Sequence, residues 1–237
     1  MGRLSVLMYH NICEDNKKSS GLTISVQKLE EQFKYLSQHY HSLFVSELEN
    51  QKTLPGRTVV ITFDDVTENQ LLLAVPLLQK YNLKATFFVP FNYIGKHDLW
   101  NKGTEKIMTI EQLKSLPENV VELGHHSYNH NKYSQMSNKD IHEDFRNSYK
   151  VIQESGLKVY PALAYPYGNY PKSSPDNYLN FIHILKENNI KMAFKIGNRP
   201  NLFPIKDNYQ IKRIDVKGED SLFTFKLKVK VGKLKLF

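Results

Sequence analysis

Two adjacent carboxylates, Asp64 and Asp65, end the strand-like stretch VVITFDD (residues 59–65). A single Asp is enough to form the local hydrogen bonds of an exposed turn. Two Asp side by side repel each other unless something cationic shares their site. Either water solvates this pair or a metal ion binds there.

Two histidines, His126 and His130, follow a second strand-like stretch, VVEL at 120–123. Their separation of four residues is one helical turn, which would place both imidazoles on one side, at a spacing that one divalent ion can bridge. With one carboxylate, they leave coordination positions for water and substrate, as in a catalytic rather than a structural site. Such a pair also arises by chance among nine histidines, so its occurrence together with the Asp pair is the better evidence.

The segments that must position these residues alternate between strand-like and helix-like patterns. Strands are predicted at residues 4–9, 58–63, 84–90, 120–123, 161–166, 192–196 and 210–216. Helices are predicted at residues 25–39, 68–81, 138–154 and 176–188. This alternation, without a dividing linker, predicts one α/β domain over residues 1–237, with a parallel sheet that is either open or closed as a barrel.

Capping residues mark three of the expected helix starts. Ser25 is the predicted N-cap of the first long helix. Ser46 with Glu49, and Thr109 with Gln112, have the spacing of capping boxes for two short helices.

Composition excludes several classes of protein. A hydrophobic content of 41% is ample for a buried core, and the single cysteine, Cys13, rules out an internal disulfide. The start MGRLSVLMYH lacks the apolar stretch of a signal peptide, so a cytoplasmic location is expected. The net charge of +8 comes without a helix-turn-helix, RNA-binding or zinc-finger signature, so nucleic acid is not an expected partner.

The basic tail, which starts at about residue 217, contains the stretch FKLKVKVGKLKLF. Its alternation of Lys with Leu or Val predicts a terminal strand with one basic face. The alternative is a segment that makes weak contact with an anionic membrane surface, which would make the protein membrane-associated.

The ordered motifs TFDD (62–65), HSxxH (126–130) and AYPYG (164–168) resemble those of the polysaccharide deacetylase family, also called carbohydrate esterase family 4 or the NodB-homology domain. The stretches VLMYH, KATFFVP and IKRIDV are similar to the branch that includes poly-N-acetylglucosamine deacetylases. The similarity runs from residue 4 to about 216 and implies a distorted (β/α) barrel of about seven strands.

The resemblance also implies roles for the motif residues. Asp65, His126 and His130 are expected to bind one divalent metal ion, with zinc preferred and nickel, cobalt or iron as alternatives. Asp64 is the expected general base, and the backbone N–H of Tyr167 is the expected donor to the oxyanion. Since adjacent strand residues point to opposite faces, Asp64 and Asp65 can share a site only where the backbone leaves its pleat.

A histidine and an arginine outside these motifs complete the expected catalytic set. His10 is the candidate general acid, because the poly-N-acetylglucosamine branch is similar in placing a histidine near the N-terminus; a histidine buried and bonded to backbone is the alternative. Ala164 stands where many members have an arginine that orients the base. Arg213 is a candidate replacement from a later strand, with a surface ion pair as the alternative.

One further departure from the family pattern concerns the first motif. Val66 stands where glycine is common, and a β-branched residue resists positive φ, so a turn that needs this conformation would be strained.

Aromatic residues are candidates for substrate binding. The resemblance implies that Tyr165, Pro166 and Tyr167 form a groove wall, and the tyrosine rings are candidates for stacking on sugars, with ordinary core packing as the alternative. Trp100, the only tryptophan, lies in the segment 91–108, the longest connection without clear periodicity. Such loops after strands shape the substrate sites of α/β folds.

The resemblance implies a metal-dependent hydrolase that removes N-acetyl groups from a sugar of a glycan or a lipid-linked saccharide. A carbohydrate-binding barrel that has lost turnover is one alternative. A metal-dependent O-acetyl esterase is the other.

Overall fold

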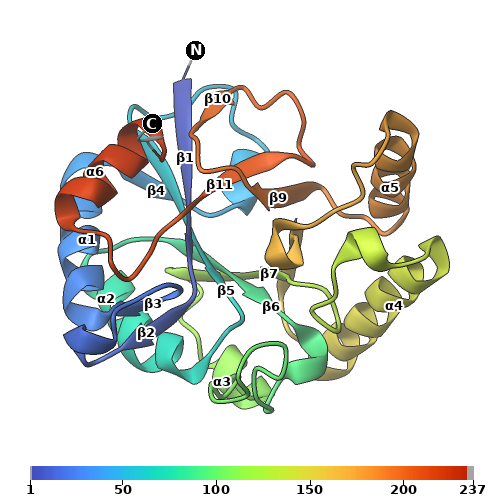
Figure 1. Cartoon of the computed structure of the whole chain (residues 1–237), viewed down its shortest axis with the longest axis horizontal. Coiled ribbons are helices and arrows are strands. Elements are labelled where there is room, and N and C mark those ends of the chain that lie inside the picture. The colour runs from blue at the N-terminus through green and yellow to red at the C-terminus, as the bar shows by residue number, and fades with distance from the viewer. Residues whose placement is uncertain (1, 234–237) are drawn as a thin grey trace.

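In the computed structural model, which describes residues 2–233, seven parallel strands form a closed barrel (Figure 1). In order around the barrel they are β1 (Gly2–Tyr9), β5 (Thr58–Asp64), β6 (Ala85–Val89), β7 (Val121–His125), β8 (Val159–Ala164), β9 (Met192–Ile196) and β11 (Ile211–Asp215). Pairing of β11 with β1 closes the ring, with Leu7 opposite Ile214. The prediction of a distorted (β/α) barrel of about seven strands is confirmed.

Short strands also lie outside the ring. The strand β4 (His41–Leu43) pairs in parallel with the first half of β5, and β10 (Asn201–Phe203) pairs antiparallel with the start of β1. The strands β2 (Asn11–Cys13) and β3 (Thr23–Ser25) form a separate two-stranded sheet. The sequence pattern did not predict β2, β3 or β10, because three-residue strands are too short to show a period.

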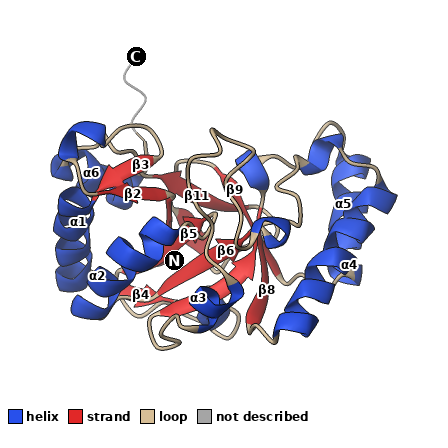
Figure 2. Ribbon diagram, turned by 90° about the horizontal axis from the view of Figure 1, so that it is seen from below, coloured by secondary structure: helices blue, strands red, loops and turns tan. Residues whose placement is uncertain are grey.

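Helices cover the outside of the barrel on two sides. Their bounds are α1 (Val26–His39), α2 (Val75–Lys80), α3 (Ile110–Lys114), α4 (Asn138–Ser155), α5 (Pro175–Glu187) and α6 (Leu222–Val231). Figure 2 shows α1, α2 and α6 on one side and α4 and α5 on the other. The predicted caps Ser25 and Thr109 are confirmed, and Thr109 forms its full capping box with Gln112.

Alternate residues of the buried strands face two different cores. All seven residues of β5 are buried. Val60 belongs to a cluster that includes Leu4 and Val6 of β1, whereas Ile61 and Phe63 belong to the cluster beneath the helices. Because side chains alternate along a strand, Thr62 and Asp64 face the same side of β5 as Val60. The barrel therefore directs polar side chains inward at the carboxyl end of this strand.

The prediction of a C-terminal strand is wrong, because residues 222–231 form the helix α6. Ser221 caps this helix by accepting from the N–H of Thr224. Phe225 and Val229, four residues apart, are buried, as is Lys228, whose ammonium binds the carboxylate of Asp220. The alternation of Lys with apolar residues suggested a strand, in which every second side chain is buried. The buried residues are instead spaced by three and four, as on one face of a helix, and Lys228 is one of them because Asp220 neutralises its charge. Residues 234–237 of the expected tail lie outside the described part of the chain.

Two further predictions of helices need correction. The helix expected over 68–81 consists of a π-helical turn, Gln70–Ala74, followed by α2. The short segment Ser46–Leu48 is a 3₁₀ turn without a side-chain cap, so the predicted box of Ser46 with Glu49 is wrong. There, Glu47 instead accepts from the N–H of Phe44. Among the described residues, no helix has the length and apolar character needed to cross a membrane.

Candidate active site

Both carboxylates of the first motif reach one site because the backbone leaves the strand geometry at the end of β5. Asp65 and Val66 have φ values of 78° and 46°, in the left-handed region. The N–H of Asp65 bonds to the carbonyl oxygen of Phe88, which holds this turn against β6. Val66 thus has the conformation that a β-branched residue resists, and the first motif contains local strain.

Asp64 forms a buried bidentate ion pair with Arg213 of β11. Arg213 Nη1 donates to Asp64 Oδ1 (2.6 Å) and Nη2 to Oδ2 (2.8 Å), and Nη1 also lies 3.3 Å from Thr62 Oγ1. The Arg213 side chain is 1% exposed, so the surface ion pair considered from the sequence is not what forms. Burial alone would raise the pKa of Asp64, but the charge of Arg213 holds it well below its usual range.

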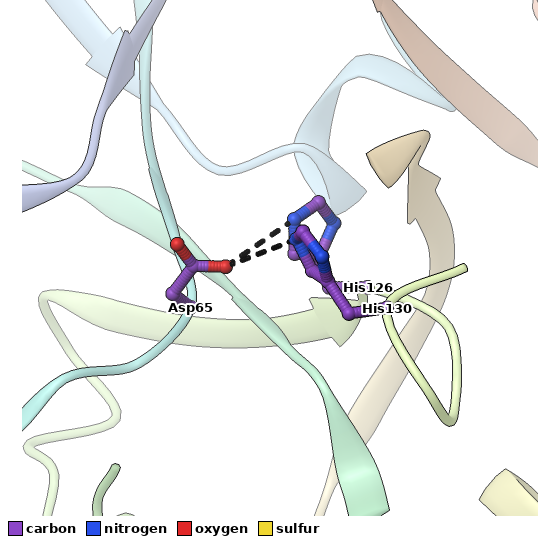
Figure 3. Close-up of side chains that lie close together, drawn as sticks. All are labelled: Asp65, His126 and His130. Atoms are coloured by element: carbon purple, nitrogen blue, oxygen red, sulfur yellow. Dashed lines mark ion pairs between the residues drawn. The ribbon is translucent and has the colours of Figure 1, made fainter. Parts of the chain in front are cut away.

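Asp65, His126 and His130 converge on a common point (Figure 3). Asp65 Oδ1 lies 3.5 Å from His126 Nε2 and 3.4 Å from His130 Nε2, and the three ligand atoms lie within 4.8 Å of one another. The expected helical turn between the histidines is not present. A loop after β7, with positive φ at Ser127 (63°) and His130 (55°), brings the imidazoles together instead.

The donor atoms of these three residues fit a divalent cation. The His126 Nδ1–H donates to the carbonyl oxygen of Ala164 (2.8 Å), so its Nε2 presents a lone pair toward Asp65. Burial lowers the pKa of His126 to about 4, which keeps the ring neutral. Asp65 Oδ1 is buried and has no hydrogen-bond partner in the described residues. Lone pairs from two imidazoles and a carboxylate face one point, as metal ligands do.

Aromatic rings enclose His130. Trp100 stacks on its imidazole with ring centroids 4.3 Å apart, and the Tyr167 ring meets it edge-on at 4.8 Å. Trp100 also packs against Tyr93 within the 91–108 connection. The long loop therefore contacts the cluster of Asp65, His126 and His130 through Trp100, and one face of the Trp100 ring packs on a histidine.

The third motif divides into a buried part and an exposed part. Tyr165 is fully buried, donates its hydroxyl to the carbonyl oxygen of Tyr209, and stacks on Tyr170. Pro166 is also buried. Of the two alternatives for Tyr165, core packing is therefore the one that the structure has, and the buried side chains of Tyr165 and Pro166 do not form an open groove wall. Tyr167, with φ of 58° and 49% exposure, is the residue of this motif that faces solvent at the site.

His10 lies beside the base candidate. It follows β1, its side chain is 13% exposed, and its Nε2 is 3.6 Å from Asp64 Oδ2. Its Nδ1 has no hydrogen-bond partner within residues 2–233, so the alternative of a histidine held by a side-chain bond to the backbone does not apply. The barrel thus brings His10 and Asp64, at the ends of β1 and β5, together with Arg213, in the middle of β11.

Two polar residues at the site were not predicted from the sequence. Asp144 of α4 accepts from the N–H groups of Tyr128 (2.9 Å) and Asn129 (3.4 Å) through one oxygen and from the Tyr133 hydroxyl (3.0 Å) through the other. It thereby fixes the loop between the two histidines. In the sequence, Asp144 could have been noticed as a carboxylate on the mainly apolar face of an amphipathic helix.

The second residue is Gln70, whose side chain donates to the carbonyl oxygens of His10 and Asp64. No feature of the sequence indicates this role.

The family model for polysaccharide deacetylase matches residues 51–176, more than half of the 237-residue chain. The chain belongs to the polysaccharide deacetylase family. The matched segment contains Asp64, Asp65, His126 and His130, whereas His10 and Arg213 lie outside it.

Individual relatives agree with this assignment. The protein YxkH of Bacillus subtilis, whose name describes it as a polysaccharide deacetylase, is 28% identical over 173 residues. These residues cover 71% of this chain and 58% of that protein. The poly-β-1,6-N-acetyl-D-glucosamine N-deacetylase of Staphylococcus epidermidis is 26% identical over 223 residues, covering 88% of this chain and 73% of that protein. This polysaccharide deacetylase family chain therefore spans little more than half the length of the first relative.

A solved structure shares the fold of this chain over nearly its whole length. The Streptococcus pyogenes deacetylase PplD in complex with acetate superposes with a TM-score of 0.77 at 22% identity. The match covers 96% of this chain and 98% of that one. At this identity the likeness concerns the barrel alone.

Proposed function

We propose that this chain is a metal-dependent hydrolase that removes N-acetyl groups from the sugars of an N-acetylated glycan. The observation that carries the proposal is the convergence of Asp65, His126 and His130 on one point beside an ionised, arginine-bound Asp64. Family membership supports a deacetylase, and the name of the Staphylococcus epidermidis relative supports an N-acetylated glucosamine polymer as the substrate class.

Asp65, His126 and His130 would hold the cation, with zinc expected and nickel, cobalt or iron as alternatives. When bound, the cation supplies Lewis-acid polarisation of the acetyl carbonyl and of water, whose pKa falls toward about 7 in such sites. The carbonyl oxygen of Ala164 fixes the ring of His126, and Asp144 fixes the loop that carries His130. These contacts would preserve the ligand geometry through turnover.

The remaining chemistry belongs to residues around this cluster. Asp64 is proposed to take the proton of the attacking water; Arg213 keeps it ionised and fixes the plane of its carboxylate. The backbone N–H of Tyr167 is proposed to donate to the oxyanion that forms on the acetyl carbonyl oxygen when water attacks the carbonyl carbon. His10, 3.6 Å from Asp64, is proposed to protonate the sugar nitrogen as it leaves.

The proposal is tested by measuring bound metal and acetate release from chitooligosaccharides and poly-N-acetylglucosamine. Asp64→Asn is expected to retain metal and to lose turnover by about 10²-fold or more, as for removal of a general base. Asp176→Asn, at an exposed position on α5, is the matched control and should behave as wild type. Because Asp64→Asn leaves Arg213 without its counter-charge, folding of the variant is checked by circular dichroism.

The alternatives correspond to distinct results of the same assay. Acetate release from O-acetylated but not N-acetylated sugars would indicate an esterase. Glycan binding without acetate release, in a protein saturated with zinc, nickel or cobalt, would indicate a carbohydrate-binding barrel. Equal acetate release by wild type and Asp64→Asn would remove Asp64 from the role of base.

Weak contact with an anionic membrane surface, and with it a lipid-linked substrate, stays a prediction, as does a cytoplasmic location. The helix α6 exposes Phe223 (71% exposed) and Lys230, while Phe225 and Val229 are buried. Deleting this segment would damage the core, so the test is Phe223→Ser with Lys230→Glu. Unchanged co-sedimentation of this variant with anionic vesicles would refute the contact.

A further inference from the structure

Gln70 bonds to the backbone of both residues to which the proposed function assigns proton transfer. Its Nε2 donates to the carbonyl oxygen of His10 (3.0 Å) and to that of Asp64 (2.6 Å), and the side chain is fully buried. Tyr9 and Phe63 are the last residues that pair β1 with β5, and His10 and Asp64 directly follow them. Gln70 therefore bridges the two strand ends at the point where their parallel ladder stops.

A π-helical turn places Gln70 at this point. The turn covers Gln70–Ala74, and the N–H of Val75 donates to the carbonyl oxygen of Gln70. Such a turn contains one residue more than an α-helical turn, and π turns inside helices occur frequently at functional sites. With this geometry Gln70 reaches the strand ends while Ala74 and Val75 remain in the core.

The residue before it, Asn69, fixes the chain on the other side of His10. Asn69 Oδ1 accepts from the N–H of Ile12 (2.9 Å). The side chain of His10 has weaker restraints. Its Nδ1 has no hydrogen-bond partner in the described chain, and its Nε2 contacts Asp64 only at 3.6 Å. The position of the imidazole therefore depends on the backbone on both sides of it.

Asp64 is held differently, because Arg213 binds both of its carboxylate oxygens. Without the Gln70 donors, two backbone carbonyl groups would lose a hydrogen bond, and an unpaired buried polar group is costly. The chain would relax where it is least restrained, which is at His10. We propose that Gln70 is a positioning residue that holds His10 where it can protonate the leaving sugar nitrogen. This inference rests on the proposed function.

Dependence on the leaving group provides the test. An amide needs a proton on its nitrogen as the bond to carbon breaks, whereas an activated aryl acetate expels a stable phenolate without one. Gln70→Met keeps the length of the side chain and removes both donors. In the zinc-loaded protein, kcat for acetate release from N-acetylglucosamine oligomers is expected to fall on the order of 10²-fold, the scale of a small misplacement. The kcat for an aryl acetate should change about twofold or less.

The matched control is Gln79→Met, at an exposed position on α2, which should leave both rates and the zinc content at wild-type values. Equal losses of kcat on the amide and the aryl ester would overturn the proposal, because general structural damage does not distinguish leaving groups. Should Gln70→Met fail to fold, Asn69→Ala releases the same segment from the Ile12 side. Its loss must again be selective for the amide, and an unselective loss or no loss overturns the proposal.

The result for the wild type separates this inference from the proposed function. A wild-type protein that binds zinc and releases acetate from neither substrate would refute the proposed function and the role of His10 together. A wild-type protein that is active on both, with a Gln70→Met variant that is equally active on both, would refute the role of Gln70 alone.

Discussion

Arg213 and Asp64 form a two-point ion pair in the barrel interior although 149 residues separate them in the chain. The two bonds, of 2.6 and 2.8 Å, match the fork of a guanidinium to the two oxygens of a carboxylate. Closure of the barrel brings them together, because β11 and β5 both pair with β1. The pair keeps Asp64 ionised and fixes its orientation, at the expense of lower basicity.

The first prediction concerns the geometry of this pair. Arg213→Lys keeps the positive charge but removes the fork, so the carboxylate loses its fixed plane. We expect kcat to fall by about 10- to 100-fold with little change in KM, since an error of orientation acts on the transition state. Steady-state kinetics of acetate release measure this.

The stability of Arg213 variants provides the companion measurement. Arg213→Met leaves a buried carboxylate without a partner and should lower the free energy of unfolding by about 3–5 kcal/mol. The exposed Arg146 of α4 supplies the control, because Arg146→Lys and Arg146→Met should change neither kinetics nor urea unfolding. An Arg213→Met protein as stable as wild type would contradict a paired, buried role.

The second prediction concerns metal binding. A ligand that binds the native state stabilises it by about 2.7 kcal/mol at a concentration 100 times its Kd. Zinc should therefore raise Tm, and a chelator should reverse the rise. His130→Ala removes one of the three donors and should abolish most of the shift. His183→Ala, at an exposed histidine on α5, should keep it. A zinc-induced shift of the same size in His130→Ala would contradict the assigned ligand set.

The local part of the site could be predicted from the sequence, because the residues that form it are close together in the chain. Asp64 with Asp65, and His126 with His130, are each within one short motif after a strand. The α/β alternation then predicted that the two strand ends meet. The loop conformation between the histidines was not predictable, since residue spacing alone does not distinguish a helical turn from a loop with positive φ.

The long-range part of the site was harder to predict. Arg213 was one of two equal possibilities, because only barrel closure decides whether it faces Asp64 or solvent. Gln70 could not be found, since the continuous helix predicted over 68–81 did not include the π turn that places its side chain. The C-terminal helix was missed because Lys228 was treated as a surface residue, although Asp220 pairs with it in the interior.

The third prediction concerns the strained residue Val66, for which two effects oppose each other. Val66→Gly relieves a left-handed conformation that costs a β-branched residue about 1–2 kcal/mol. It also removes a fully buried side chain, worth about 1.5–3 kcal/mol, and adds the backbone entropy of glycine, up to about 1 kcal/mol. The losses are larger, so Val66→Gly should lower the free energy of unfolding by about 1–2 kcal/mol.

Urea unfolding of Val66→Gly and Val66→Ala separates these two effects. Val66→Ala loses most of the buried surface and has a smaller side chain at the same positive φ. Both variants should keep metal binding, because the proposed ligand Asp65 is held by the bond of its N–H to the carbonyl oxygen of Phe88. A Val66→Gly protein more stable than wild type would mean that strain outweighs packing at this turn.

The last prediction concerns the pH dependence of stability and rests on Asp144. Burial raises the pKa of this carboxyl to about 6, against the opposing effect of the N–H groups of Tyr128 and Asn129 and the hydroxyl of Tyr133. Because the folded pKa lies above the unfolded value of about 4, its stabilising contribution is complete below pH 4 and is lost as pH rises through 6.

Asp144→Asn isolates this contribution. The amide cannot ionise, its oxygen can still accept from the N–H of Tyr128, and its nitrogen can donate to the Tyr133 hydroxyl. The variant should therefore gain on wild type between pH 4 and 7, by up to about 3 kcal/mol. Urea unfolding of both proteins across this range measures the difference, in which other titrating groups such as the buried His125 cancel. Parallel stability curves for the two proteins would show that Asp144 does not ionise within this range in the folded protein.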